Sequence, residues 1–480
     1  MSIKIPHLKD ATVNDSCKVI LDGIETTIRD DNNILLIGNG FDISLGKKTT
    51  YKDFIVYLFI LYLFKFVISL NNNFDISHLL DSVRNDLICK RIKQDNDLIK
   101  ILDIARNRLT SVSLDKICCS SRSSFSFLDL LLRVVFQSTY NKIFKDIVYY
   151  SKERKNLEIK TEVCFDYWLS SFSKKLSDSR DILSVAGVTS DCLKEFYKDF
   201  LKATEDSKLH GWLDVENLIQ YMVLNESILN EQFIVENALK SYVSSSVFKN
   251  GLCNDITSSR GIYLTLQFFT IEFCCFINLQ NISRFDSYYY DKFNSETDLY
   301  DIDFRLPSKY NSHTKLDFEN SLYKIIDFNY SSTSEHTFYY NYKQHNHFDF
   351  YHVNGRSEDF TAVFGYTNLE QKKVNIEAFN FEKRTQRLIK NVPSVDYEAL
   401  TGRPFNLFIF GHSCSPADKD VFEPLLTSNN LNIVVVYCYS EQDKLSIYKN
   451  LCEILGYKLM DNLTRQTDKI SKRLFWAMRK

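Results

Sequence analysis

Short apolar runs that end at glycine turns mark both ends of the chain as strand-forming. Ile34 to Ile37 are four consecutive aliphatic residues, as is typical of a buried parallel strand, and the turn Gly38-Asn39-Gly40 follows at once. Phe405 to Phe410 form another apolar run, followed by Gly411-His412-Ser413. We therefore predict that both runs lie in one sheet, with their glycine turns at the same edge. The other predicted strands are Leu322 to Tyr330, Phe348 to Val353, Thr361 to Gly365 and Asn432 to Tyr439.

The middle of the chain is patterned as helix, with apolar residues at mixed three- and four-residue spacing and few glycines. Near the end of the chain, Glu441 to Leu455 is predicted as an amphipathic helix that Gly456 ends. The predicted helical stretches of the middle are Asp81 to Arg108, Phe144 to Lys160 and Asp191 to Thr204. The predicted irregular segments are Ser111 to Ser126, Phe285 to Asn311 and residues 1 to 30, the last as a polar lead-in with a short helix.

These elements predict an α/β protein with a parallel sheet and a large helical insertion. Residues 1–50 would supply the first strand and its glycine turn, residues 51–320 the mainly helical insertion, and residues 321–480 the remainder of the α/β domain. A chain of 480 residues is long enough for two or three domains.

One apolar segment raises the question of a membrane. Phe54 to Leu70 is strongly apolar, and Lys65 is its only charge. The segment is just under the length that spans a bilayer. We predict a buried helix packed against the insertion, and not a membrane anchor.

Composition narrows the class of protein. The chain is 44% hydrophobic and 25% charged with a net charge of −2, which describes a globular protein and indicates no nucleic-acid partner. Its twelve cysteines form no CxxC pair, and no signal peptide opens the chain, so we expect reduced thiols and a cytoplasmic location. His345, His347 and His352 have no Cys or carboxylate partner in a recognised pattern, so no metal is expected.

The first glycine turn is a candidate phosphate site. Glycines let a ligand approach the backbone, and a turn between strand and helix aims N–H groups at a phosphate. Neither common motif matches, because Ile43 stands where a dinucleotide fingerprint has its third glycine, and five residues separate Gly40 from Gly46 where a P-loop has four. A strand-ending turn without a ligand remains the alternative.

Several polar residues near strand ends have both a binding and a structural interpretation. Asp42 would hold a ribose hydroxyl or cap the following helix. Asn329 would hold a ribose or a carboxamide, or be a turn residue. His412, between two small residues, would be a base or a hydrogen-bond donor, and Asp418 a ligand or a helix cap. Trp212, Asp214 and Glu216 are expected to pack rather than to act as an acid/base pair.

Seven short motifs in order resemble the AbiH family of bacterial abortive-infection proteins. The resemblance covers most of the chain and implies a role in defence against bacteriophages. The matching residues are Leu36-Ile37-Gly38-Asn39-Gly40-Phe41-Asp42, Thr50-Tyr51-Lys52-Asp53-Phe54, Trp212-Leu213-Asp214-Val215-Glu216, Asp327-Phe328-Asn329-Tyr330-Ser331, His352-Val353-Asn354-Gly355, Phe364-Gly365-Tyr366, and Phe410-Gly411-His412-Ser413 with Asp418.

The same order also resembles the sirtuin-like NAD-binding fold, a Rossmann-related parallel sheet. That resemblance implies NAD as substrate or ligand and His352, His412 and Asn329 as candidate catalytic residues. Asn354 stands where the sirtuin-like pattern has its histidine, and His352 lies two residues earlier, about 7 Å along a strand. The implied NAD-binding residues are Gly38, Asn39, Gly40, Phe41, Asp42, Asn329, Tyr330, Asn354, Gly411, His412, Ser413 and Asp418.

Two functions follow from these resemblances. The chain would hydrolyse NAD to nicotinamide and ADP-ribose, or it would bind a nucleotide without turnover, as a sensor or interaction module. Its partners would be the nucleotide, an unidentified phage component and, as a further possibility, a second copy of the chain.

Overall fold

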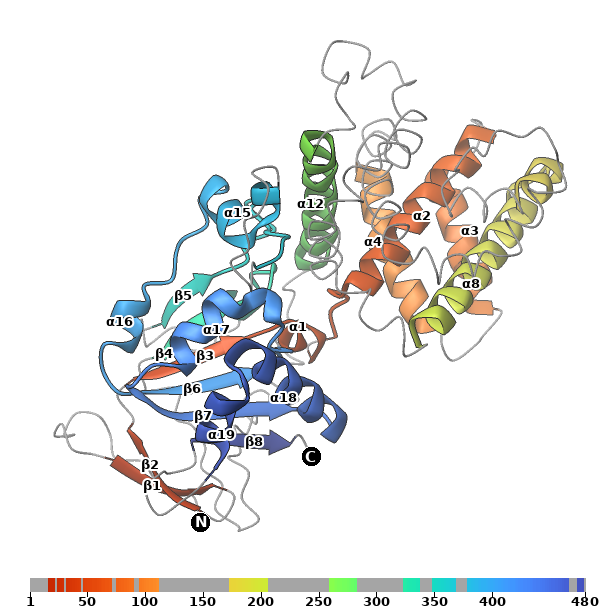
Figure 1. Ribbon diagram of the computed structural model, residues 1–480. Coiled ribbons are helices and arrows are strands. Elements are labelled where there is room, and N and C mark those ends of the chain that lie inside the picture. The colour runs from red at the N-terminus through yellow and green to blue at the C-terminus, as the bar shows by residue number, and fades with distance from the viewer. Residues whose placement is uncertain are drawn as a thin grey trace, which may run out of the picture.

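A six-stranded, all-parallel sheet forms the centre of the computed structural model (Figure 1). Its strands lie in the order β5-β4-β3-β6-β7-β8. Their bounds are β3 Asn33–Ile37, β4 Tyr323–Asp327, β5 Phe348–His352, β6 Phe405–Phe410, β7 Leu431–Cys438 and β8 Leu474–Met478. The structure describes residues 16–21, 24–29, 32–44, 46–70, 75–89, 95–111, 172–205, 259–282, 323–336, 348–367, 378–465 and 473–478.

Both glycine turns lie where the order of the strands along the chain reverses, between β3 and β6. Numbered along the chain, the strands lie in the order 3-2-1-4-5-6 of doubly wound dinucleotide-binding sheets. β3 is the central strand, and its last residue, Ile37, lies opposite Asp327 on one side and Phe410 on the other. In open α/β sheets, ligands bind beyond the carboxyl ends of the strands at this switch point. The predicted α/β class and the pairing of Ile34–Ile37 with Phe405–Phe410 are confirmed.

Helices from the C-terminal part of the chain cover one face of the sheet. Ile34, Leu407 and Val434 share a buried cluster with residues of these helices. Ser440 caps α18 by accepting a hydrogen bond from the Asp443 N–H, and Gly456 ends it at φ +77°, as predicted. The helices are α16 Tyr397–Thr401, α17 Lys419–Leu426, α18 Glu441–Leu455 and α19 Tyr457–Thr464.

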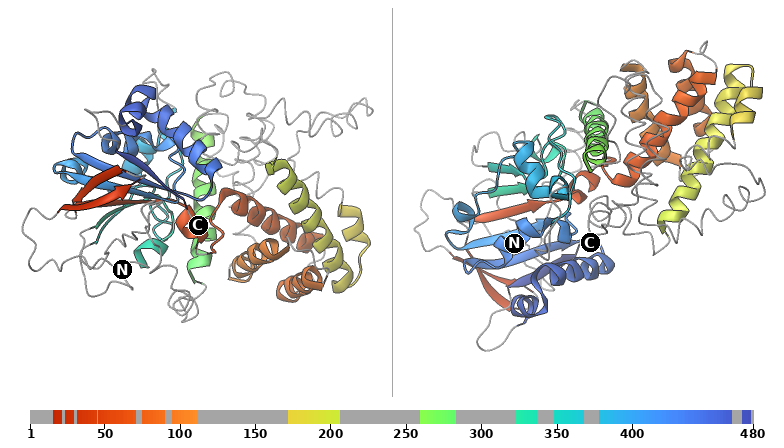
Figure 2. Two further views of the ribbon diagram at one scale, coloured as in Figure 1. Left: turned by 90° about the horizontal axis from the view of Figure 1, so that it is seen from below. Right: turned by 45° about the horizontal axis from the view of Figure 1, so that its top comes forward.

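A helical region lies between β3 and β4 in the chain and beside the sheet in space, with α12 between the sheet and the other helices (Figures 1 and 2). The prediction of Asp81 to Arg108 is confirmed as two helices, and that of Asp191 to Thr204 as part of α8. The bounds are α2 Tyr51–Leu70, α3 Ile76–Cys89, α4 Asp95–Ser111, α8 Ile182–Glu205 and α12 Ser259–Ile282. Phe144 to Lys160, Phe285 to Asn311, Trp212, Asp214, Glu216, and residues 112–126 of the serine-rich segment lie outside the described residues.

The apolar segment is a buried helix of this region. Thr50 and Asp53 exchange side-chain and backbone hydrogen bonds in a capping box that begins α2. Residues 54–61 of α2 are almost fully buried in the helical core, as predicted. Among the helices that the structure describes, none is long and apolar enough to cross a membrane.

An aromatic cluster joins the helical region to the sheet. Phe364 stacks on Tyr330 at 5.2 Å and meets Phe273 of α12 edge-on at 5.0 Å. The Tyr330 hydroxyl donates to the Val363 carbonyl at 3.0 Å and lies 3.3 Å from the Tyr51 hydroxyl. The segment that follows β4 is therefore fixed against α2 and α12.

Three expectations for individual elements were wrong or incomplete. β1 Ser16–Leu21 and β2 Ile24–Arg29 form an antiparallel pair, so the short helix predicted within residues 1 to 30 does not lie in these two segments, and residues 1–15 lie outside the described ranges. Thr361 to Gly365 is not a strand, because the Val363 N–H binds the Asn354 carbonyl and the Phe364 N–H binds the Gln386 side chain. The edge strand β8 was not predicted.

Candidate functional site

The two glycine turns pack directly on each other. The Gly38 N–H donates to the Phe410 carbonyl at 2.9 Å, and the Gly40 N–H donates to the Gly411 carbonyl at 2.8 Å. The Phe41 N–H donates to the Gly38 carbonyl at 2.9 Å. The expectation that the first turn presents free N–H groups to a phosphate is therefore wrong for these three residues. Their glycines are explained by the contact, since a Cβ on Gly38 would lie 2.6 Å from the Gly411 oxygen.

We expect Gly40→Ala to destabilise the fold by about 1–3 kcal/mol, because overpacking a tight site forces backbone shifts of this cost. A Cβ on Gly40 would lie 2.6 Å from the Gly411 Cα. The measurement is urea unfolding followed by circular dichroism. Gly187→Ala is the matched control, since a Cβ there meets nothing within 4 Å, and in helix α8 it should be neutral or stabilise by up to about 1 kcal/mol. Equal stability of the two variants would contradict the packing of the turns.

Asp42, just after the first turn, is held by side chains that follow β4. It lies inside α1 Gly40–Ser44 rather than at its cap, and its Oδ2 accepts the Ser331 hydroxyl at 2.6 Å. Ser331 also lies 2.8 Å from the Thr333 hydroxyl, to which the Lys47 ammonium donates. Burial raises the pKa of Asp42, although the charge of Lys47 and the hydroxyl hydrogen bonds oppose it. Asp42 Oδ1 is buried and has no hydrogen-bond partner in the described part of the chain.

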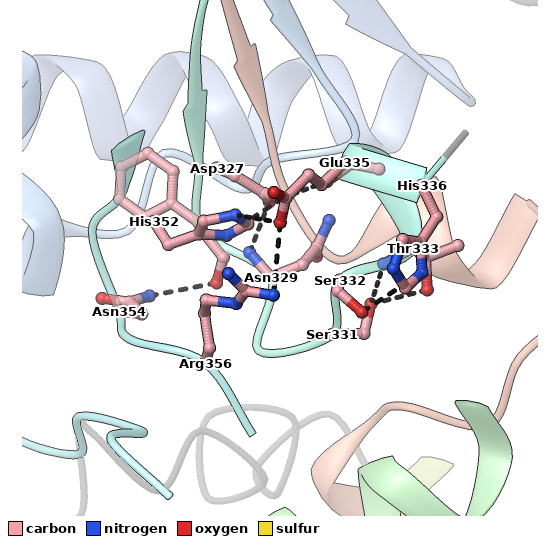
Figure 3. A network of polar contacts seen from close by, with 12 residues as sticks. Asp327, Asn329, Ser331, Ser332, Thr333, Glu335, His336, His352, Asn354 and Arg356 are labelled. Carbon is pink, nitrogen blue, oxygen red and sulfur yellow. Dashed lines mark hydrogen bonds and ion pairs between the residues drawn. The ribbon is translucent and has the colours of Figure 1, made fainter. Parts of the chain in front are cut away.

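An acid–imidazole–acid arrangement lies at the ends of β4 and β5 (Figure 3). Asp327 and His352 are opposite each other in the sheet, which places His352 Nδ1 3.6 Å from Asp327 Oδ2. His352 Nε2 lies 3.3 Å from Glu335 Oε2, which Arg356 also contacts at 3.3 Å. Ser334 and the Asn329 N–H donate to the Asp327 carboxylate.

The charges of this arrangement shift its pKa values. Burial raises the pKa of Asp327 to about 6, although the His352 charge and two hydrogen bonds oppose it. Burial alone would lower the pKa of His352, but the hydrogen bond to Glu335 and the charges of both carboxylates raise it overall. The pKa of Glu335 is lowered, chiefly by its hydrogen bond with His352. The geometry therefore favours an imidazolium between two carboxylates, with Glu335 partly exposed to solvent.

Asn329 has the most unusual environment in this region. Its side chain is buried between Asp327 and the Ser331–Thr333 turn (Figure 3), yet neither Oδ1 nor Nδ2 has a hydrogen-bond partner among the residues that the structure describes. Burying an unsatisfied polar group costs about 1–3 kcal/mol, so such an amide needs an explanation. Asn354 is satisfied on one side only, because its Nδ2 donates to the Phe328 carbonyl at 3.2 Å while its Oδ1 has no hydrogen-bond partner among the described residues.

His412 belongs to a separate buried cluster. The Cys414 N–H donates to His412 Nδ1 at 2.8 Å, and His412 Nε2 lies 3.5 Å from Asp418 Oδ2. Asp418 pairs at 2.5 Å with Lys383, which is fully buried, and it makes no capping hydrogen bond to α17. The partners of His412 are buried, whereas Glu335 beside His352 is partly exposed and can pass a proton to solvent, so the geometry favours His352 over His412 as a base.

The remaining predicted residues make contacts within the protein. Asn39 Oδ1 accepts the Thr49 hydroxyl at 2.5 Å, and Phe41 meets Phe410 edge-on at 6.1 Å. Tyr330 belongs to the aromatic cluster described above, and the Ser413 carbonyl accepts from Asn450 at 2.9 Å. Within the described ranges, no group of three His, Cys, Asp or Glu residues is arranged to hold a metal ion.

Most of the polar partners at this site were not predicted from the sequence. Asp327 had a detectable signal, since it precedes Asn329 by two residues at a strand end. The others make contacts that join separate parts of the chain, so no local pattern indicated their roles, although Ser331 belongs to the motif that begins at Asp327. They are Lys47, Ser331, Thr333, Glu335, Arg356 and Lys383.

Comparison with known proteins gives one family. The family model described as "Bacteriophage abortive infection AbiH" matches residues 34–439, which span the sheet from β3 through β7 and the helical region between. No curated protein and no solved structure matches the chain.

Proposed function

Because the chain belongs to the AbiH family of bacteriophage abortive infection proteins, we propose that it acts in phage defence by binding NAD and hydrolysing it to nicotinamide and ADP-ribose. The bound dinucleotide would lie beyond the carboxyl ends of β3, β4 and β5. Loss of NAD would stop the growth of an infected cell, and a phage component would be the trigger.

The unsatisfied, buried side chain of Asn329 is the main observation that supports this proposal. Among the residues that the structure describes, neither its amide oxygen nor its amide nitrogen has a hydrogen-bond partner, and both lie at the carboxyl edge of the sheet. That edge is where doubly wound sheets bind nucleotides. The adjacent Asp327–His352–Glu335 arrangement supplies groups that can move a proton.

The proposed reaction needs little covalent chemistry from the protein. The C1′–N1 bond of NAD breaks, its electron pair leaves with neutral nicotinamide, and positive charge develops on the ribose. Water then attacks C1′, and neutral His352 takes its proton, with the Asp327 carboxylate 3.6 Å from Nδ1 stabilising the imidazolium that forms. Glu335 links His352 to solvent, through which the proton leaves. Asn329 orients the ribose or the water.

Nicotinamide release from NAD by the purified full-length chain tests this proposal. The protein is incubated with NAD, alone and with lysate of phage-infected cells, and the products are separated by chromatography. We expect nicotinamide and ADP-ribose in equal amounts, in at least one of the two conditions. Absence of both products and of NAD binding in both conditions would overturn the proposal.

A non-catalytic nucleotide sensor is the second candidate, and a specific observation favours it. His352 lies between two carboxylates, and in the protonated state that this favours it cannot accept a proton. Binding of NAD without any product, with or without the lysate, would assign the chain to this class.

A further inference from the structure

The glycine turns leave little for a diphosphate to bind. The N–H groups of Gly38, Gly40 and Phe41 donate to protein carbonyls. Backbone N–H groups at such a turn are the usual ligands of a dinucleotide pyrophosphate. Here they serve the contact between the two turns.

The nearby side chains also disfavour a phosphate. Lys47 donates to Thr333 and lies close enough to Asp42 for each to shift the pKa of the other. The carboxylates of Asp42, Asp327 and Glu335 bring negative charge to the same edge of the sheet. The cations at this edge, Lys47, Arg356 and His352, already interact with the protein's own carboxylates. A diphosphate would have to compete with those carboxylates for them, whereas a neutral sugar needs no cation.

The buried side-chain atoms of Asp42 and Asn329 that lack partners among the described residues can form hydrogen bonds with hydroxyl groups. Asp42 Oδ1 is a buried acceptor, and Asn329 offers a buried acceptor and a buried donor. The two residues follow neighbouring strands of the sheet, and Ser331, two residues after Asn329, bonds Asp42 at 2.6 Å. A vicinal diol presents two donors and two acceptors, which these atoms can satisfy.

We propose that this site recognises the ribose hydroxyls of an N-riboside through Asp42 and Asn329, and that its ligands do not require a diphosphate. The inference rests on the proposed function and specifies its ligand class as ribosides, above all those with a cationic base. NAD would then be held by its nicotinamide riboside half.

Isothermal titration with three probes tests the proposal on the full chain. The probes are NAD, inorganic pyrophosphate, and the carbocyclic analogue of nicotinamide riboside, which keeps both hydroxyls and cannot be hydrolysed. We expect the analogue to bind within about 10-fold of NAD, and pyrophosphate at 1 mM not to weaken NAD binding, since an affinity set by the riboside half needs no phosphate contact. If pyrophosphate displaces NAD and the analogue does not bind, this inference is overturned and the proposed function still stands. Binding of neither NAD nor the analogue would overturn both.

Two variants connect the binding to the named side chains. Asp42→Asn keeps the size of the side chain, and Asn329→Ala removes the free amide, so each should weaken binding of the analogue by about 10-fold or more, the scale of losing a hydrogen bond to a charged or buried group. Asp461→Asn, which removes a partly exposed charge on α19, is the control and should change nothing. A 2′,3′-dideoxy form of the analogue should bind wild type as weakly as it binds Asp42→Asn. Unchanged affinity in both site variants, with melting temperatures like that of wild type, would contradict the assignment.

Discussion

We expect His352→Ala to lower kcat for NAD hydrolysis by about 10²–10⁴-fold, the usual contribution of a general acid or base. The imidazole lies within ion-pair distance of both Asp327 and Glu335. NAD affinity should change little, because the proposed ribose contacts come from Asp42 and Asn329. Single-turnover kinetics and binding titrations separate the two effects. Full activity of a folded His352→Ala variant would exclude this residue as the base.

The pH dependence of the wild type provides an internal check of this role. A base works in its neutral form, so the rate should rise with pH as His352 loses its proton. Burial and the charge of Arg356 lower the pKa of His352, but Glu335 and Asp327 raise it above its ordinary value of 6.5 overall. Half-maximal rate should therefore lie above pH 6.5. Glu335→Gln removes a carboxylate that raises this pKa and should shift the acid limb to lower pH, whereas Asp461→Asn should leave it in place.

The framework of the sheet was predictable because its signals are local. Four aliphatic residues before Gly38 and an apolar run before Gly411 indicate buried parallel strands, and the structure pairs them directly. The apolar run Phe54 to Leu70 with its single charge at Lys65 predicted a helix that is mostly buried, although Leu70 at its end is exposed. The period of Glu441 to Leu455 and Gly456 predicted α18.

The errors in the fold have identifiable physical causes. Asp22-Gly23 between two β-prone runs is a strong hairpin signal, and the prediction of a polar lead-in for residues 1 to 30 did not take it into account. Thr361 to Gly365 has the apolar character of a strand, yet its N–H groups bind a loop carbonyl and a glutamine side chain. A short apolar run shows burial and does not show which partner supplies its hydrogen bonds.

The candidate site was only partly predictable because its contacts join distant segments. Asp42 and Asn329 were detected as polar residues after strands, but their connection through Ser331 spans 289 residues. Gly38 and Gly40 were predicted to let a phosphate approach the backbone. In the structure their missing side chains allow the two glycine turns to contact each other. Asp418 was interpreted as a ligand or a cap, and its partner Lys383 lies 35 residues away.

We expect Lys383→Met to destabilise the protein by about 3–5 kcal/mol, because breaking a buried ion pair leaves an uncompensated charge. Lys383 is fully buried, and its partner Asp418 is nearly so. The pair joins α15 Lys383–Ile389 to the segment that carries the second glycine turn. Urea unfolding at pH 7 measures the loss. Lys419→Met is the matched control, since Lys419 and Glu423 form a partly exposed pair at 3.6 Å, worth about 0–1 kcal/mol.

Acidification separates loss of the ion pair from loss of packing. Burial would raise the pKa of Asp418, but Lys383 and His412 hold it well below its ordinary value in the wild type. A depressed carboxylate pKa stabilises the fold at neutral pH, and this stability is lost as the pH falls through the folded value. In Lys383→Met that charge is missing, so the pKa of Asp418 should rise. The free energy of unfolding of the variant should then approach that of the wild type as the pH falls from 7 to 5.

Lys383→Met combined with Asp418→Leu should recover most of the loss at pH 7, because an apolar pair of similar volume can replace a buried ion pair. A deficit that is constant with pH and persists in the double variant would show that packing of the Lys383 side chain, and not its charge, holds the second glycine turn in place.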